Sequence, residues 1–320
     1  MNWLLAADVP PPIEVPAWFW EAFIGGVVAL LLLDMAVFHR KPHEVRTREA
    51  VGWTVFWISL ALAFNAWIWH EFGQKQAIDF FTAYVVEESL SVDNLFVFLL
   101  IFQHFKVPPP LQHRVLFFGI LGAIVMRFLF IFAGIALISA FHWVNWVFGA
   151  FLVFTALKLL LQKDGESDPS KSWYVRLLER ALPFSPEYHG TNLTTRRDGR
   201  RVATMLLLVV LVIEATDVAF AVDSIPAVIG ITQERFIVFT SNICAILGLR
   251  AIYFLLARFM GAFRYLKPGL ALVLGFVGVK MFGLFEVSSG LSLVVIAAIL
   301  GVAASASLLH PEKTSEPPAA

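Results

Sequence analysis

Two residue classes are scarce in this sequence: charged residues and cysteine. Charged residues make up 15% of the 320-residue chain, against roughly a quarter in soluble domains. The single cysteine, Cys244, rules out a disulfide framework or a thiolate metal site within one subunit. Lys+Arg and Asp+Glu both number 24, and this zero net charge excludes a generally basic nucleic-acid-binding protein. With 59% hydrophobic residues, the chain is expected to lie in a lipid bilayer.

Long apolar runs recur along the whole chain. About 20 residues of helix cross the hydrocarbon core of a bilayer, and the alternating pattern of barrel strands is absent. The predicted spans are 17–38, 50–70, 80–103, 114–138, 142–162, 202–224, 235–258, 266–285 and 290–309. We therefore predict an all-α, polytopic membrane protein with about nine transmembrane helices in a single membrane domain over residues 1–320. Residues 1–15 contain no basic residue, so we expect no cleavable signal peptide and a retained first span.

The distribution of lysine and arginine predicts the orientation in the membrane. Short cytoplasmic loops carry an excess of basic residues, and an N-terminus outside leaves only Lys75 and Arg235 in the outer segments. The C-terminus is then cytoplasmic, as is the polar linker at about 163–201. Within this linker, one apolar helical face predicts a surface helix, although a solvated connector fits equally well; the face comprises Trp173, Leu177, Leu178, Ala181 and Leu182. Residues 310–320 read as a disordered tail.

The chain contains an internal repeat. Val92 and Asp93 in the third span match Val222 and Asp223 in the sixth, and an acid, Glu87 or Asp217, stands six residues before each aspartate. Repeat one covers about 80–162 and repeat two about 202–285. Each copy has three spans, an odd number, so the second copy enters the membrane from the opposite side. Inverted 3+3 repeats are typical of transporters with a site near the midplane, although a relic of gene duplication would look the same.

Apart from Glu21 near the start of the first span, seven carboxylates fall inside predicted spans. An aspartate at the bilayer centre costs about 2.5–3.5 kcal/mol on insertion scales, so these groups must be paired, protonated or bound to a cation. Neighbouring amide and hydroxyl groups add further oxygen atoms. The candidate cation ligands are Glu87, Asp93, Asn94, Glu214, Asp217, Asp223 and Ser224, with Glu88 and Asp34 as additional candidates.

Oxygen ligands of this kind suit Mn, Ca or Mg. All eight histidines lie in loops or at span ends, which argues against zinc. In the structural alternative, the acids only neutralise Arg127 and Arg250, two buried arginines at matching positions of the repeat. These arginines could also hold the acids after a cation has left.

At about 100° per residue, one group of polar residues shares roughly a third of its helix circumference (Glu87, Glu88, Ser91 and Asn94), and a second group shares a similar arc (Glu214, Asp217 and Ser224). Asp93 and Asp223 lie outside these arcs, so either they face another neighbour or the helix unwinds locally near Pro226. Asp34 could take part in gating or ion entry, or it could be an interfacial acid near Arg40.

Two segments resemble the paired signatures of the TerC family of bacterial membrane proteins, closest to its Alx branch: S-L-S-V-D-N at 89–94 and A-T-D-V-A-F-A-V-D-S-I at 215–225. The resemblance implies an all-helical fold related to the lysine exporter superfamily and a role in manganese homeostasis, chiefly efflux. It assigns the ion site to the seven candidate ligands named above. Glu88 departs from the basic residue that many relatives carry there, so its membership of the site stays open.

These observations predict a secondary transporter that exports Mn(II) across the bacterial cytoplasmic membrane, with proton exchange as one coupling model. The alternative is a membrane partner of the secretion machinery that delivers Mn(II) to exported enzymes. The sequence has no P-loop pattern and no recognised nucleophile motif, so we do not expect an enzyme. The expected partners are a divalent cation and the lipid bilayer, without nucleic acid.

Overall fold

The computed structural model describes residues 14–38, 47–141, 143–161, 177, 184–185, 187–197, 200–257, 265–283 and 287–309. Its helices follow the predicted segments closely. They are α1 (Ala17–Phe38), α2 (Thr47–Phe72), α3 (Gln74–His104), α4 (Pro109–Ala140), α5 (Val144–Leu161), α7 (Met205–Ile229), α8 (Arg235–Leu256), α9 (Leu266–Met281) and α10 (Ser289–Leu309).

Six of these helices are long and apolar enough to cross a membrane: α2, α4, α5, α7, α8 and α10. The described apolar part of α1 is shorter, α9 has only 16 residues, and α3 carries the acidic cluster. The prediction of an all-α, polytopic membrane protein is therefore confirmed, while the number of nine spans stays a prediction.

Local sequence explains several helix ends. Gly73 has φ 93°, a conformation that favours glycine, and this residue lets α3 begin directly after α2 ends. Prolines occupy the first turn of α4, where their missing N–H groups break no helical hydrogen bond. At the start of α7, the Thr204 hydroxyl accepts a hydrogen bond from the Leu207 backbone N–H at 3.4 Å.

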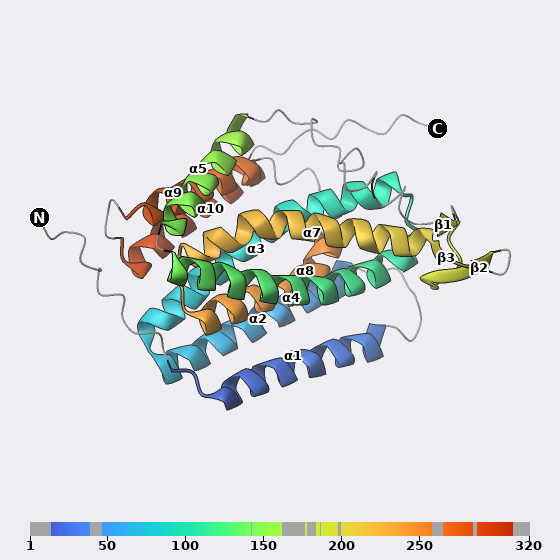
Figure 1. The fold of residues 1–320 in the computed structure, drawn as a ribbon, viewed down its shortest axis with the longest axis horizontal. Helices are drawn as coiled ribbons and strands as arrows, with labels where there is room; N and C mark the ends of the chain where they lie inside the picture. Colours follow the sequence, from blue (N-terminus) through green and yellow to red (C-terminus); the bar gives the residue numbers. More distant parts are fainter. Residues whose placement is uncertain are drawn as a thin grey trace, which may run out of the picture.

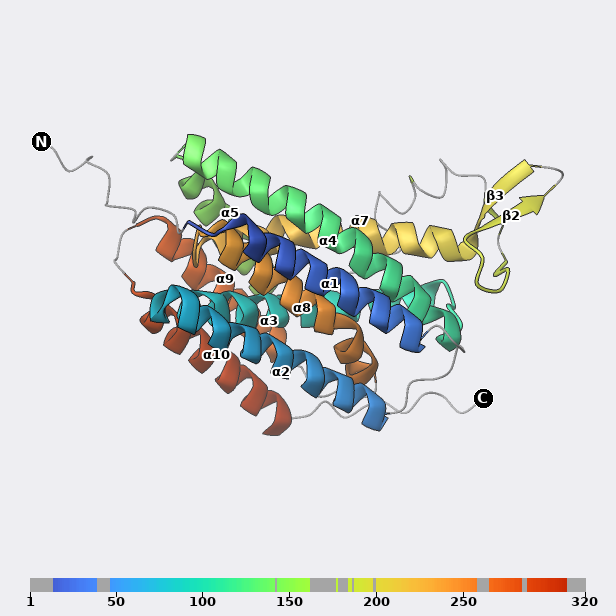
Figure 2. The same cartoon turned by 90° about the horizontal axis from the view of Figure 1, so that it is seen from below.

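The helices form one elongated bundle in which segments far apart in the sequence pack together (Figure 1). α3 packs against α8, α4 against α7, and α5 against α9. The α5 and α9 backbones approach so closely that a Cβ on Gly149 would lie 2.8 Å from the carbonyl oxygen of Gly278. α1 lies along the bundle between α2 and α4 (Figure 2), where Trp20 contacts Phe132 and Phe236, and Phe23 contacts Phe64.

A small sheet precedes α7 at one end of the bundle (Figure 1). Its strands β1 (Phe184–Ser185), β2 (Thr194–Arg197) and β3 (Arg200–Thr204) have the order β1-β3-β2, with β2 and β3 antiparallel. The Tyr188 hydroxyl donates to the Phe105 carbonyl oxygen at 2.8 Å and so ties the linker to the α3–α4 connection. Burial raises the pKa of this hydroxyl to about 12.

This sheet was not predicted from the sequence. Asp198-Gly199 between two threonine- and arginine-rich stretches is a typical hairpin signal, and it marks the β2–β3 pair in retrospect. The predicted surface helix at 173–182 lies outside the described residues except for Leu177, and the predicted disordered tail at 310–320 lies wholly outside them.

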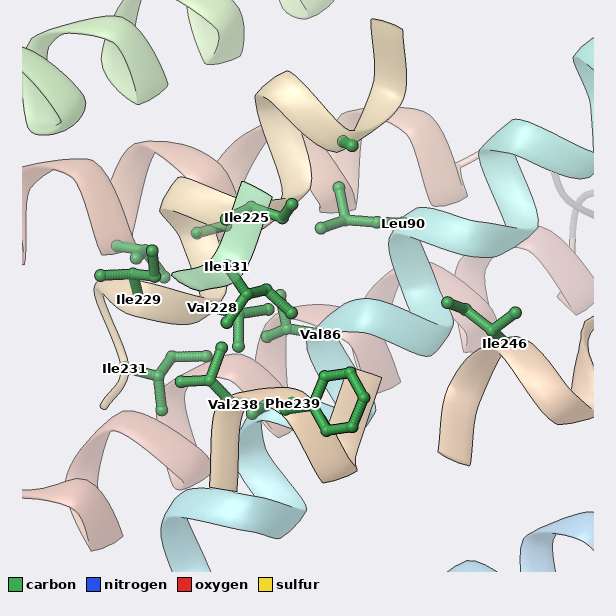
Figure 3. Close-up of a cluster of buried hydrophobic side chains, with 14 of the residues drawn as sticks. Val86, Leu90, Ile131, Ile225, Val228, Ile229, Ile231, Val238, Phe239 and Ile246 are labelled. Carbon is green, nitrogen blue, oxygen red and sulfur yellow. The ribbon is translucent and has the colours of Figure 1, made fainter. Parts of the chain in front are cut away.

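Three apolar clusters fill the bundle, and two of them meet along α7. The first apolar cluster, drawn in Figure 3, includes Val86, Ile131, Ile225 and Val238. The second apolar cluster lies nearer the sheet and includes Leu95, Phe98, Ile213 and Tyr253. Along α7, Ile213 belongs to the second cluster and Ala221 to the first, so Asp217 stands where the two clusters meet.

Candidate functional site

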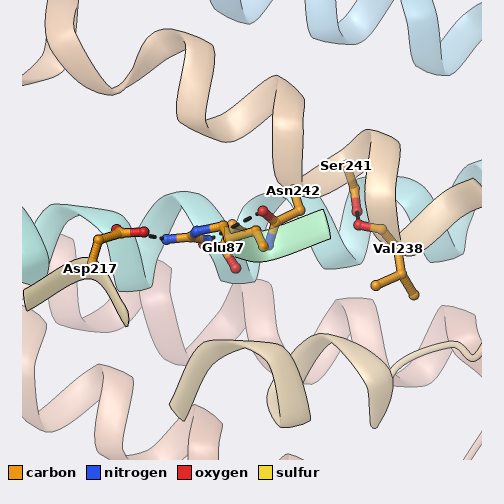
Figure 4. A network of polar contacts seen from close by, with 6 residues as sticks. Glu87, Asp217, Val238, Ser241 and Asn242 are labelled. Atoms are coloured by element: carbon orange, nitrogen blue, oxygen red, sulfur yellow. Dashed lines mark hydrogen bonds and ion pairs between the residues drawn. The ribbon is translucent and has the colours of Figure 1, made fainter. Parts of the chain in front are cut away.

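A network of four polar side chains lies near the middle of the bundle. α3 contributes Glu87, α4 Arg127, α7 Asp217 and α8 Asn242, and Figure 4 shows three of them around the guanidinium of Arg127. Glu87, Arg127 and Asn242 are fully buried, and Asp217 is 4% exposed. The sequence thus brings one polar residue from each of four helices to one point.

Arg127 holds this network together. It donates from Nη1 to Glu87 Oε1 in a short ion pair, and to Asn242 Oδ1 at 3.3 Å. From Nη2 it reaches Asp217 Oδ1 at 3.4 Å. An isolated charge in such an interior is strongly unfavourable, but two acids and an amide around one guanidinium compensate each other. The two acids are the matched pair of the sequence repeat.

The network does not use all of its polar atoms. Among the residues that the structure describes, Glu87 Oε2 and Asp217 Oδ2 are buried without a hydrogen-bond partner. The same is true of the Ser91 and Ser224 hydroxyls, on the same two helices. Buried polar atoms without partners cost about 1–3 kcal/mol each, so these oxygens require a further partner. Oxygen atoms from α3 and α7 are chemically suited to a hard divalent cation.

The remaining predicted acids occupy different positions. Glu88 is directed toward α8, where a Cβ on Gly248 would lie 3.9 Å from its Oε1 atom. Glu214 packs against α4 at Gly122, and a Cβ on Gly122 would overlap the Glu214 carboxylate. Gly122 therefore leaves the space that Glu214 occupies.

The structure leaves part of the predicted site undescribed. Asp93 and Asp223 belong to α3 and α7, and Asp34 belongs to α1, but their side chains lie outside the described part. Asn94 and Ser224 are buried on α3 and α7, and Arg250 is buried on α8. Among the described side chains, no three from His, Cys, Asp and Glu form a group that could hold a metal ion. The seven-residue ion site therefore stays a prediction.

One of the two explanations offered for Asp223 is wrong. α7 does not unwind near Pro226 but continues as a helix to Ile229. Because Pro226 lies in the last turn of α7, its missing N–H removes only one helical bond. Its carbonyl oxygen still accepts a hydrogen bond from the Gly230 N–H at 2.9 Å. That Asp93 and Asp223 face another neighbour stays a prediction.

Two features of the site were missed by sequence analysis. Asn242 of α8 accepts a hydrogen bond from the guanidinium of Arg127 on α4 and so joins the network, although it was not among the candidate ligands. An open cavity of about 1440 Å³ also lies where α3, α8 and α10 begin. Its charged lining residues are Lys75, Asp79, Glu234, Arg235 and Lys280.

Comparisons with known proteins agree with this picture. Residues 72–315 match the model of the integral membrane protein TerC family. The chain is 48% identical to an uncharacterized membrane protein of Myxococcus xanthus, over 93% of this chain and 94% of the relative. It is 44% identical to Alx of Salmonella typhi, whose name describes a proposed membrane-bound redox modulator, over 88% of this chain and 91% of the relative.

A plant protein is similar to this chain to about the same degree. The thylakoid membrane protein TERC of Arabidopsis thaliana is 45% identical over 81% of this chain and 68% of its own length. No solved structure shows a significant match. The family model and these relatives cover most of the chain, so it is an integral, multi-pass membrane protein of the TerC family, in its Alx branch.

Proposed function

We propose that this chain is a secondary transporter that exports Mn(II) across the bacterial cytoplasmic membrane. One observation carries the proposal: acids from α3 and α7 meet in the middle of the bundle and retain carboxylate oxygens without a hydrogen-bond partner among the described residues. Transporter sites of this kind lie near the midplane between two repeats.

The packing pattern supports the inverted repeat. A two-fold axis that exchanges α3 with α7 and α4 with α8 also exchanges the α3–α8 contact with the α4–α7 contact. Both contacts are present, and α5 packs against α9, its own counterpart. A repeat at about 80–162 and another at about 202–285 would produce this exchange. Relative rocking of the two copies would then expose the site to each side in turn.

The first apolar cluster supports a closed resting conformation. The first apolar cluster separates the Arg127 network from the open cavity, since it includes Val228 and Ile229 of α7, and Ile229 reaches the cavity wall. That cavity contains Lys75 and Arg235, the two basic residues assigned to the outer side by the charge distribution. We place the cavity on the outer side, with the N-terminus outside and the sheet in the cytoplasm.

The direct test is transport by the purified protein in liposomes. Vesicles that contain the protein should take up Mn(II) faster than protein-free vesicles, and Ca(II) and Mg(II) are measured in parallel to establish selectivity. A pH indicator inside the vesicles records linked proton movement. Absence of uptake for all three ions would contradict the proposal. Unchanged cellular Mn together with unmetallated exported enzymes in a deletion strain would instead favour delivery at the secretion machinery.

A substitution at Gly122 tests the site without replacing any candidate ligand. Gly122→Ala adds a Cβ where the Glu214 carboxylate lies, so the acid must move away from α4. We expect a loss of about 10–100-fold in apparent Mn(II) affinity, the range found when the support of a metal ligand is disturbed. The measurement is the concentration dependence of uptake into vesicles.

The matched control is Gly52→Ala on α2, where a Cβ would meet nothing within 4 Å. This variant should transport like the wild type. Equal affinities in the Gly122 and Gly52 variants would show that the position of Glu214 does not matter for transport.

A further inference from the structure

Arg127 occupies the position between the two repeats at which a cation would be shared. Its guanidinium contacts an acid from each copy, Glu87 on α3 and Asp217 on α7, and it is fully buried. The positive charge comes from the chain itself, on α4 of the first repeat. In this conformation the arginine supplies the charge compensation that a bound cation would otherwise supply.

The guanidinium and a divalent ion compete for the same two carboxylates. A hard ion such as Mn(II) binds carboxylate oxygens at about 2.0–2.6 Å. Glu87 Oε1 and Asp217 Oδ1 already accept from Arg127, so an ion on the unpartnered oxygens Glu87 Oε2 and Asp217 Oδ2 would lie close to the guanidinium. Two positive groups at that separation in a weakly polarisable interior repel each other strongly. A cation that uses both acids must therefore displace the guanidinium from at least one of them.

The contacts of Arg127 are suited to such an exchange. A guanidinium has five N–H donors, and its Nε is buried without a hydrogen-bond partner among the described residues. The contact to Asp217 is long for a charge-assisted hydrogen bond, at 3.4 Å. Arg127 is thus held only weakly by the acid of the second repeat.

We propose that Arg127 is an internal counter-cation, which holds Glu87 and Asp217 when no metal is bound and is displaced when a divalent ion enters. This inference rests on the proposed transport function. It explains how the metal-free site can return through the closed conformation without protons on both acids. Removal of the guanidinium should strengthen metal binding and slow the return of the empty site.

The test separates net transport from exchange. In net efflux the empty site must return, whereas in Mn(II)/Mn(II) exchange, measured with radioactive Mn(II), the site crosses loaded in both directions. For Arg127→Gln in vesicles we expect net efflux to fall about tenfold or more while exchange persists, and Mn(II) to bind about tenfold more tightly, within the usual range of coupling between sites. Arg127→Lys, which keeps the charge, should restore net efflux to within a few fold of wild type.

The matched control is Arg114→Gln, near the start of α4, where the arginine lies over the Phe118 ring. It should leave net efflux, exchange and binding unchanged. If Arg127→Gln does not fold, Arg127→Met is measured instead. It also removes the charge but keeps an apolar chain in the same space, and the same separation of net efflux from exchange is expected.

Several outcomes would overturn the inference. Net efflux and exchange could fall equally in a folded variant, net efflux could stay unchanged, or Arg127→Lys could be as slow as Arg127→Gln. Any of these would make Arg127 a structural residue only. A wild-type protein without Mn(II) binding or exchange is a different result, because it contradicts the proposed transport function itself.

Discussion

Glu87→Ala is expected to lower the free energy of unfolding by about 3–5 kcal/mol, the usual cost of removing one partner of a buried ion pair. Glu87 and Arg127 are both fully buried and form an ion pair with each other. Without Glu87, the guanidinium keeps only the 3.4 Å contact to Asp217 and the 3.3 Å contact to Asn242. Thermal unfolding of the purified protein in detergent provides the measurement.

A double variant distinguishes the cost of an unpaired charge from the cost of lost packing. Glu87→Ala combined with Arg127→Met removes both charges, and we expect it to be more stable than Glu87→Ala alone, because buried pairs can often be replaced by apolar groups at little cost. Glu71→Ala removes a half-exposed acid that pairs with His70, and should change stability by less than about 1 kcal/mol. A double variant no more stable than the single one would show that charge is not what Glu87 compensates.

The helices could be predicted because the membrane makes the sequence signal strong. A bilayer requires about 20 apolar residues per span, and each predicted run corresponds to a helix in the structure. The sheet was harder to predict because β1 has two residues and β2 four, too few for a periodic pattern. Its stability depends on contacts outside the strands, such as the hydrogen bond from Tyr188 to Phe105.

The candidate site could be predicted only in part. Acids in apolar segments are visible in a sequence because their burial is costly, and this singled out Glu87 and Asp217. Which arginine they share is a tertiary property: Arg127 lies 40 residues after Glu87 and 90 before Asp217. The open cavity was invisible for the same reason, since its lining comes from the ends of several helices.

The ion pairs of Arg127 also bear on the alternative in which the acids only neutralise buried arginines. Two of the acids do neutralise a buried arginine, as that alternative predicts. Glu88 and Glu214, however, form no ion pair with a basic residue among the described side chains. Glu214 occupies space that only a glycine at position 122 leaves free, which favours a function for this acid beyond charge balance.

Asp93→Asn and Asp223→Asn, made separately, are each expected to abolish Mn(II) export while membrane insertion stays intact. Each aspartate lies six residues after an acid of the Arg127 network, on α3 or α7, and these two helices pack against each other. Asparagine keeps the size of the side chain and removes its charge, so the fold should persist. Loss of a ligand charge should cost at least the roughly 10–100-fold in metal affinity that follows from changes around a metal site.

Growth of an export-deficient strain in Mn(II), together with uptake into vesicles, measures this effect. Glu71→Gln is the matched control, because it removes a half-exposed carboxylate outside the network and should leave tolerance unchanged. If the proposed inverted repeat is correct, the two matched positions must fail alike, which makes the prediction stringent. Full tolerance in both variants would contradict the assignment of Asp93 and Asp223 as ligands. The proposed site would then comprise only Glu87, Asp217 and their neighbours around Arg127.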